Sequence, residues 1–180
     1  MSNKPVFIFD FFGVLCEEVG DIWIEKHDLK AMKGVISKIT YRGDIGEISM
    51  LDECELLGRL SGQSAEEVLE EFKNTAKINT GLVDYIKNNK DKYRFAMLSN
   101  ASSDFVRSLI AGTELEQLFE KIYISSDVQM VKPDAEIFHL VCETMQVLPR
   151  QCILIDDREQ NVDSAKAEGM KGILYSFPRG

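Results

Sequence analysis

"PVFIFDFFGVLCEE", residues 5–18, joins a short apolar run to a single acid. Residues 6–9 are all apolar, the run ends at Asp10, and Gly13 follows three positions later. A run of this kind is typical of a strand buried on both faces of a sheet. The glycine allows the backbone to turn sharply after it. We therefore expect the first strand of a sheet here, with Asp10 presented at its carboxyl end.

Four further apolar runs with strand-forming residues lie at 95–98, 122–124, 153–155 and 173–175. Between the later ones, helical periodicity is present at 82–90, 103–110, 135–145 and 162–169. Strands that alternate with helices of this length predict an α/β fold with a parallel sheet flanked by helices. Ligands of such sheets bind at the carboxyl ends of the strands, so the residues just after each run are the candidates for function.

Residues 16–81 differ from the rest because they contain helical stripes and no convincing strand. Ser49 and Asp52, and again Ser64 and Glu67, have the spacing of a capping box at the start of a helix. We predict an all-helical insert at 16–81, and a sheet-containing core made of 1–15 and 82–180.

Composition limits the possible partners. The 180 residues are 44% hydrophobic and 28% charged, with a formal net charge of −9, which predicts a folded domain that repels nucleic acid and anionic membranes. No signal peptide and no apolar run of membrane-spanning length is evident. The four cysteines form no CxxC pair, which favours reduced, mostly buried thiols in a cytoplasmic protein. Monomer and homodimer both remain open.

Polar residues follow four of the expected strands: Asp10, the pair Ser99-Asn100, Lys132 before Pro133, and the pair Asp156-Asp157. Three carboxylates in one small space stay ionised together only if a cation lies among them. Oxygen ligands suit Mg²⁺, which commonly binds a few carboxylates together with a substrate phosphate. Lys132 and Ser99 could contact the phosphate oxygens. The residues alone therefore indicate a metal-assisted phosphate site in which one carboxylate is free to act as the nucleophile.

The segments "FDFFGVL", "LSN", "VKPDAEIF" and "ILIDDREQNVDSAKAEGM" resemble the haloacid dehalogenase-like hydrolase superfamily over nearly the whole chain. The insert, with "YRGDIGEIS", is similar to the small helical cap that one subgroup carries after its first strand. The resemblance implies a Rossmann-like core, a mobile cap, Mg²⁺ and an aspartyl-phosphate intermediate.

The resemblance also implies roles for single residues. Asp10 would be the nucleophile, and Lys132 would steady it. The metal would be held by one oxygen of Asp10, the carbonyl of Phe12, Asp156 and Asp157. The phosphate would be bound by Ser99, the backbone of Asn100 and Lys132. Asn161 stands where many relatives carry another acid, which suggests that it supports the metal site.

Phe12 departs from the phosphatases of this family, which usually have a second Asp two residues after the nucleophile. That Asp protonates the leaving alcohol and then activates water, and Phe12 can do neither. We predict a Mg²⁺-dependent phosphatase of a small phosphorylated metabolite, possibly a sugar phosphate, that tolerates this change. Its substrate could have an acidic leaving oxygen, or Glu17, Glu18 or a cap residue could supply the acid. The alternatives are a non-catalytic protein that binds phosphate or a partner and, less favoured, a 2-haloacid dehalogenase.

Overall fold

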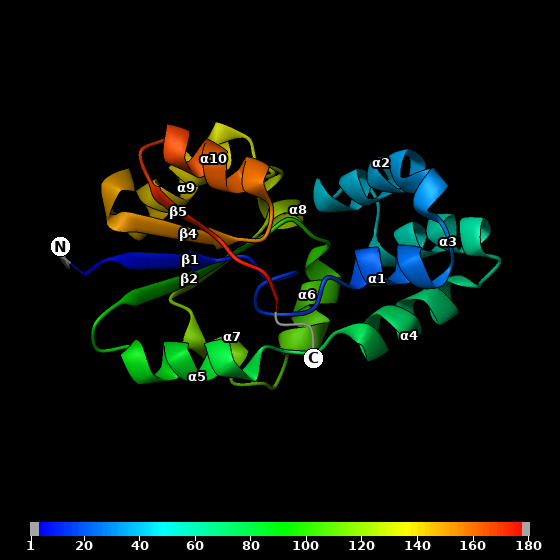
Figure 1. Cartoon of the computed structure of the whole chain (residues 1–180), viewed down its shortest axis with the longest axis horizontal. Coiled ribbons are helices and arrows are strands. Elements are labelled where there is room, and N and C mark those ends of the chain that lie inside the picture. The colour runs from blue at the N-terminus through cyan, green and yellow to red at the C-terminus, as the bar shows by residue number, and fades with distance from the viewer. Residues whose placement is uncertain (1–3, 178–180) are drawn as a thin grey trace.

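The computed structural model describes residues 4–177, which form a five-stranded parallel sheet with helices on both faces and a separate group of helices beyond one end of the strands (Figure 1). The strand order is β3-β2-β1-β4-β5. The strands are β1 (Val6–Phe9), β2 (Arg94–Ser99), β3 (Lys121–Ile124), β4 (Cys152–Asp156) and β5 (Lys171–Leu174). The predicted α/β class with a parallel sheet is confirmed.

The first strand lies at the centre of the sheet because its apolar residues are buried on both faces. β1 pairs with β2 on one side and with β4 on the other, so that Ile8 lies beside both Ala96 and Leu154. On one face, Phe9 belongs to a hydrophobic cluster that includes residues of α5 (Thr80–Asn89), α6 (Ser103–Ile110) and α7 (Leu115–Leu118). On the other face, Ile8 belongs to a cluster with residues of α9 (Ala135–Met145) and α10 (Glu159–Ala167).

A helical insertion follows the first strand, as predicted. Its helices are α1 (Val19–Lys26), the short 3-10 helix Lys30–Met32, α2 (Lys33–Asp44), α3 (Met50–Ser61) and α4 (Ala65–Thr75). These helices share a further hydrophobic cluster, which Phe105 of α6 also joins, whereas α5, which leads back to the sheet, packs against the core. The exact cap boundaries of 16 and 81 remain a prediction.

Both predicted capping boxes are present in the insertion. The hydroxyl of Ser49 accepts a hydrogen bond from the backbone N–H of Asp52, whose carboxylate accepts one from the N–H of Ser49. Ser64 and Glu67 exchange the same pair of bonds at the start of α4. Each box satisfies two backbone donors that a helix start leaves unpaired, so the sequence sets where these two helices begin.

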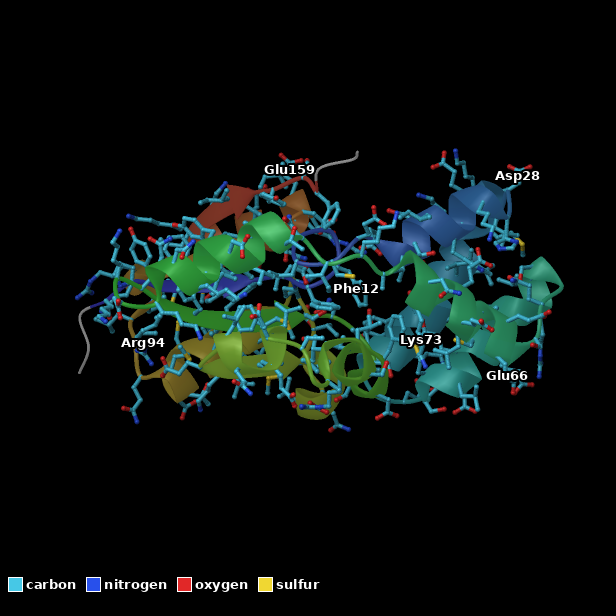
Figure 2. All side chains as sticks on the ribbon, turned by 90° about the horizontal axis from the view of Figure 1, so that it is seen from below. Phe12, Asp28, Glu66, Lys73, Arg94 and Glu159 are labelled. Carbon is cyan, nitrogen blue, oxygen red and sulfur yellow. The ribbon has the colours of Figure 1, made fainter. Side chains whose placement is uncertain are left out.

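A row of aromatic rings connects the insertion to the core. Phe12, just after β1, stacks on Phe105 of α6 with ring centroids 5.8 Å apart. Phe105 lies 6.1 Å from Phe72 of α4, which lies 5.9 Å from Trp23 of α1. Figure 2 shows Phe12 at the junction of the two parts, whereas Arg94 lies at the opposite end of the sheet. Phe12 therefore has a packing role that the sequence did not indicate.

The differences from the expected elements are local. The last strand comprises Lys171–Leu174 rather than 173–175, because an edge strand with mostly exposed side chains lacks the continuous apolar run that marks the inner strands. The short helices α7 and α8 (Ser125–Val128) also lie outside the expected set, because four residues are too few for periodicity to show.

The four cysteines are free and buried, as their sequence context predicted. No helix in the described part of the chain combines the length and apolar character that crossing a membrane requires.

Candidate active site at the carboxyl ends of the strands

Three carboxylates from two neighbouring strands meet at one edge of the sheet. Asp10 follows β1, and Asp156 and Asp157 lie at the end of β4. One oxygen from each lies within 4.8 Å of the others. Because β1 and β4 are parallel neighbours, their carboxyl ends are adjacent. The convergence that the strand ends predicted is therefore present.

Lys132 lies among these acids and is itself buried. Its ammonium group is 2.9 Å from Oδ2 of Asp10 and 2.6 Å from Oδ2 of Asp156. It donates a third hydrogen bond of 2.9 Å to the carbonyl of Leu98 at the end of β2. An ammonium has three donors, so each of them has a partner here, and one charge links the ends of three strands.

The side-chain amide of Asn100 fixes the backbone of Lys132. Its Oδ1 accepts a hydrogen bond of 2.9 Å from the N–H of Lys132, and its Nδ2 donates one of 2.8 Å to the Lys132 carbonyl. Only the backbone of Asn100 is therefore free for a ligand. Ser99, at the end of β2, is fully buried and its hydroxyl has no hydrogen-bond partner in the described structure.

Asp156 is occupied on both oxygens. Oδ2 is paired with Lys132, and Oδ1 accepts hydrogen bonds of 2.9 Å from the backbone of Arg158 and from Nδ2 of Asn161. Burial by itself would raise the pKa of Asp156, but Lys132 and these donors hold it below its usual value. Asp156 is therefore ionised and held in place.

Asp157 depends on Gly13 for its position. The glycine has a φ of +78°, and a Cβ built there would lie 2.3 Å from Oδ2 of Asp157. Only glycine combines this left-handed backbone with this close approach. Oδ1 of Asp157 and Oδ1 of Asn161 are buried and have no hydrogen-bond partner within the described residues.

The charges of the site do not balance. Burial raises the pKa of Asp10 well above its usual value; Lys132 opposes this rise, and Asp156 and Asp157 add to it. Burial likewise raises the pKa of Asp157, although Arg158 and Lys132 oppose that rise. One ammonium thus lies among three carboxylates, with Arg158 as a further cation nearby, and Asp157 and Asn161 each keep an oxygen without a partner among the described residues. An oxygen-ligated cation such as Mg²⁺ fits both the charge and the donor set.

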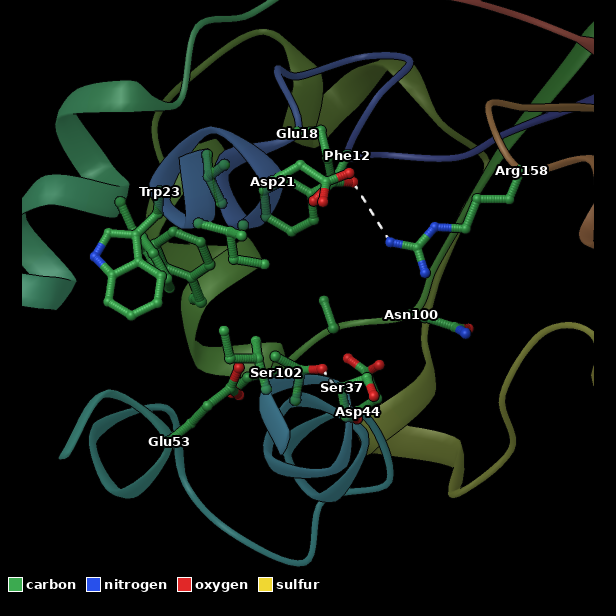
Figure 3. Close-up of a pocket in the computed structure, with 18 of the residues that line it drawn as sticks. Phe12, Glu18, Asp21, Trp23, Ser37, Asp44, Glu53, Asn100, Ser102 and Arg158 are labelled. Atoms are coloured by element: carbon green, nitrogen blue, oxygen red, sulfur yellow. Dashed lines mark hydrogen bonds and ion pairs between the residues drawn. The ribbon is translucent and has the colours of Figure 1, made fainter. Parts of the chain in front are cut away.

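A cavity of about 530 Å³ lies between this site and the insertion. Asp10, Phe12, Lys132 and Asp157 line it from the core, and residues of α1, α2, α3 and α4 line it from the insertion (Figure 3). This volume suits a small metabolite.

Glu18 and Arg158 face each other at the wall of this cavity, with 3.7 Å between their nearest charged atoms (Figure 3). Burial raises the pKa of Glu18 to about 7; Arg158 opposes the rise, and Asp157 and Asp21 add to it. Glu17, the other candidate acid nearby, is not among the residues that line the cavity.

Sequence reasoning missed two acids of the insertion, Asp44 and Glu53, which also line the cavity. A signal for Glu53 was present: it lies on the same helical face as Met50, Cys54 and Leu57, which are buried. A charged residue within an apolar stripe is either paired or functional, and that pattern could have identified it.

A family model described as haloacid dehalogenase-like hydrolase matches residues 4–169. The chain belongs to this family. The prediction of an enzyme of this class, made from the four strand-end segments, is confirmed.

Curated relatives of this hydrolase include phosphatases. A phosphorylated carbohydrates phosphatase of Thermotoga maritima is 26% identical over 64% of this chain and 55% of its own length, so the match spans about half of that relative. A D-ribitol-5-phosphate phosphatase of Bacteroides thetaiotaomicron is 24% identical over 91% of this chain and 88% of its own. In fold, the hydrolase is similar to a HAD family enzyme of Bacteroides thetaiotaomicron solved with magnesium and inorganic phosphate, with a TM-score of 0.75 and 22% identity over 95% of this chain and 93% of that one.

The close approach of Gly13 to Asp157 can be tested by substitution. Gly62 has the same φ of +78° but nothing within 4 Å of a built Cβ, so Gly62→Ala isolates the backbone penalty, which is about 1–2 kcal/mol. We expect Gly13→Ala to lower the free energy of unfolding in urea by about 1–3 kcal/mol more than Gly62→Ala, because it adds a collision in a packed site. Equal losses would show that the Asp157 carboxylate moves aside at little cost.

Proposed function

We propose that this hydrolase is a Mg²⁺-dependent phosphatase of a small phosphorylated metabolite, with sugar phosphates as one candidate class. The observation that carries the proposal is the convergence of Asp10, Lys132 and the Asp156-Asp157 pair at the base of a cavity of metabolite size. The phosphatase names of the relatives support it. We also propose that residues 16–81 act as the cap that closes over the substrate.

The roles we propose follow the contacts. Asp10, Asp156, Asp157 and the carbonyl of Phe12 would hold Mg²⁺, which supplies positive charge to the transferring phosphoryl group. The Ser99 hydroxyl and the backbone N–H of Asn100 would donate to the phosphate oxygens. Lys132 has no free donor, because its three partners are Asp10, Asp156 and the carbonyl of Leu98. Its contribution to phosphate binding is therefore its charge, and its contacts also hold Asp10 in position for attack.

The reaction we propose has two steps. An oxygen of the Asp10 carboxylate attacks phosphorus, the bond from phosphorus to the ester oxygen breaks, and the leaving oxygen takes up a proton. Water then attacks the phosphorus of the aspartyl-phosphate and gives a proton to a basic group. The bond from phosphorus to the Asp10 oxygen breaks, which releases inorganic phosphate and regenerates the Asp10 carboxylate.

Because position 12 is a phenylalanine, the acid that usually transfers protons in related phosphatases is absent. General acid–base catalysis contributes about 10²–10⁴-fold in rate, whereas electrostatic stabilisation is usually the larger effect. We propose that Glu18 supplies the proton. It lines the same cavity, and its raised pKa of about 7 suits a group that must both give and take a proton near neutrality.

Substituting the nucleophile tests the covalent mechanism. We expect Asp10→Asn to lower phosphatase turnover by about 10³-fold or more, because an amide cannot attack phosphorus. Asp163→Asn is the matched control, since the Asp163 side chain is 64% exposed. Intact-mass measurement of quenched reactions should detect one added phosphate on the wild type only. Turnover that survives in Asp10→Asn would contradict the mechanism, and phosphate binding by the wild type without turnover would favour the non-catalytic alternative.

Two substitutions of Phe12 isolate the missing acid. Both Phe12→Asp and Phe12→Asn lose the stacking on Phe105, but only the first restores an ionisable group. We expect kcat for a simple alkyl phosphate to be at least about 10-fold higher in Phe12→Asp than in Phe12→Asn. Equal rates in the two variants would mean that an acid at this position has no access to the leaving oxygen.

Glu18 predicts a pH dependence. Its pKa is raised from 4.5 to about 7, so it holds its proton below about pH 7 and loses it above. As the donor to the leaving oxygen it must be protonated, so kcat/KM should fall as the pH rises through about 7. Glu18→Gln should abolish this fall and lower kcat/KM, whereas Glu17→Gln should change neither the pH profile nor kcat/KM. If kcat/KM of Glu18→Gln still fell through about pH 7, the titrating group would be another residue.

A further inference from the structure

Glu53 is a buried acid that points into the cavity from the insertion. It lies on α3, its residue is only 7% exposed, and it is one of the residues that line the cavity (Figure 3). Its carboxylate makes no hydrogen bond or ion pair that the structure records for the described chain. A carboxyl group that is mostly buried and has no partner of opposite charge is costly, so its presence in the cavity wall points to a ligand.

The packing of the insertion makes room for this carboxylate. Gly43, near the end of α2, lies directly against it: a Cβ built on Gly43 would be 2.1 Å from Oε2 of Glu53. Any larger side chain at position 43 would displace the acid. Gly43 and Glu53 together therefore shape this part of the cavity wall.

Two acids share this region, and one of them, Glu53, has no cation acting on it among the described residues. Burial raises the pKa of Glu53 to about 8, and the nearby charge of Asp44 adds to the rise. Burial also raises the pKa of Asp44 to about 6, but Arg158 and Lys132 oppose that rise. The basic residues that line the cavity have other partners: Lys33 is 3.1 Å from Asp21, Lys132 is paired with Asp10 and Asp156, and Arg158 faces Glu18.

The aromatic part of the cavity wall suits a cation. Trp23, Phe72 and Phe105 line the same cavity, and aromatic faces attract cations. A hydroxyl group could bond to Glu53 but would bring no charge to favour its ionised form. An ammonium group would bring both the donors and the charge that restores the ionised form of Glu53.

We propose that the substrate is a small phosphate monoester that carries an ammonium group, with the phosphate at Asp10 and the ammonium against Glu53, near Asp44. This inference rests on the proposed phosphatase function and specifies its substrate class. The cavity would then have two electrostatic ends, one for the anion beside Lys132 and one for the cation between α2 and α3. An ester with a carboxylate at the second end would be repelled.

Three esters that differ in one group test the proposal: 2-aminoethyl, 2-hydroxyethyl and carboxymethyl phosphate. We expect kcat/KM of the wild type with Mg²⁺ to be at least about 10-fold higher for the amino ester than for the hydroxy ester, and lowest for the carboxymethyl ester. Glu53→Gln should bring the ratio of amino to hydroxy ester close to one, and Asp44→Asn should lower it. Because both rates come from one protein sample, the ratio is unaffected by partial loss of folded protein.

Glu55→Gln is the matched control, because Glu55 lies on the same helix with a 58% exposed side chain paired to Arg59. It should keep the wild-type ratio. A wild-type ratio near one would overturn the inference, and so would a ratio that Glu53→Gln leaves unchanged.

Binding separates this inference from the catalytic proposal. Calorimetry with the Asp10→Asn variant should show the amino ester binding about 10-fold tighter than the hydroxy ester, even if no ester is hydrolysed by the wild type. Tighter binding of the amino ester without turnover would support the ammonium site and contradict the phosphatase proposal. Turnover with equal binding of the two esters would support the phosphatase and contradict the ammonium site. If neither ester bound, both proposals would be contradicted.

Discussion

The ammonium group of Lys132 is the constraint on which the site depends. It is buried at the ends of three strands, where a charge is tolerated only with partners of opposite sign, and it has two carboxylates and a carbonyl within 2.9 Å. Those partners come from β1, β4 and β2, so the sheet must bring the three strands together for the charge to be satisfied. In turn, the charge keeps Asp156 ionised and orients Asp10. The strand order therefore places the partners of Lys132, and the charge of Lys132 in turn holds the two acids in position.

The sequence predicted the parts of the molecule whose signals are local. The apolar run before Asp10 and the run before Asp156 marked two of the three inner strands of the described sheet, and the Ser49 and Ser64 boxes marked two helix starts. It could not predict what depends on packing between distant segments. The stacking of Phe12 on Phe105 joins residues 93 positions apart, and the burial of Glu53 requires Gly43 on another helix. No single segment carries either relationship.

Phe12 contributes to the packing of the insertion but cannot transfer a proton. Its ring contacts Phe11 and Phe105 and begins the row of aromatic rings that reaches Trp23 in the insertion. A carboxylate in its place would shorten that row and add a fourth acid beside Asp10, Asp156 and Asp157, where only Lys132 bridges two of them. The aromatic residue therefore favours attachment of the insertion and a lower negative charge. In our proposal the proton then comes from Glu18, which lies beside Phe12 at the same cavity (Figure 3) and is buried enough to hold a proton near neutral pH.

The chain has a net charge of −9, so an anion can bind only where the local electrostatic potential is positive. Lys132 is fully paired, and Arg158 is shared between Glu18 and the acids of the site, so we propose that a bound cation adds to the positive potential at Asp10. The described part of the chain leaves Glu53 without a cation on the insertion side of the cavity, whereas Lys132 and Arg158 act on Asp44. In our proposal the two ends therefore differ: a cation at the core would favour phosphate binding, and the substrate itself would bring the positive charge to Glu53. A ligand that carries both signs, separated by the length of a small metabolite, satisfies the two ends together, whereas a ligand with phosphate alone satisfies one.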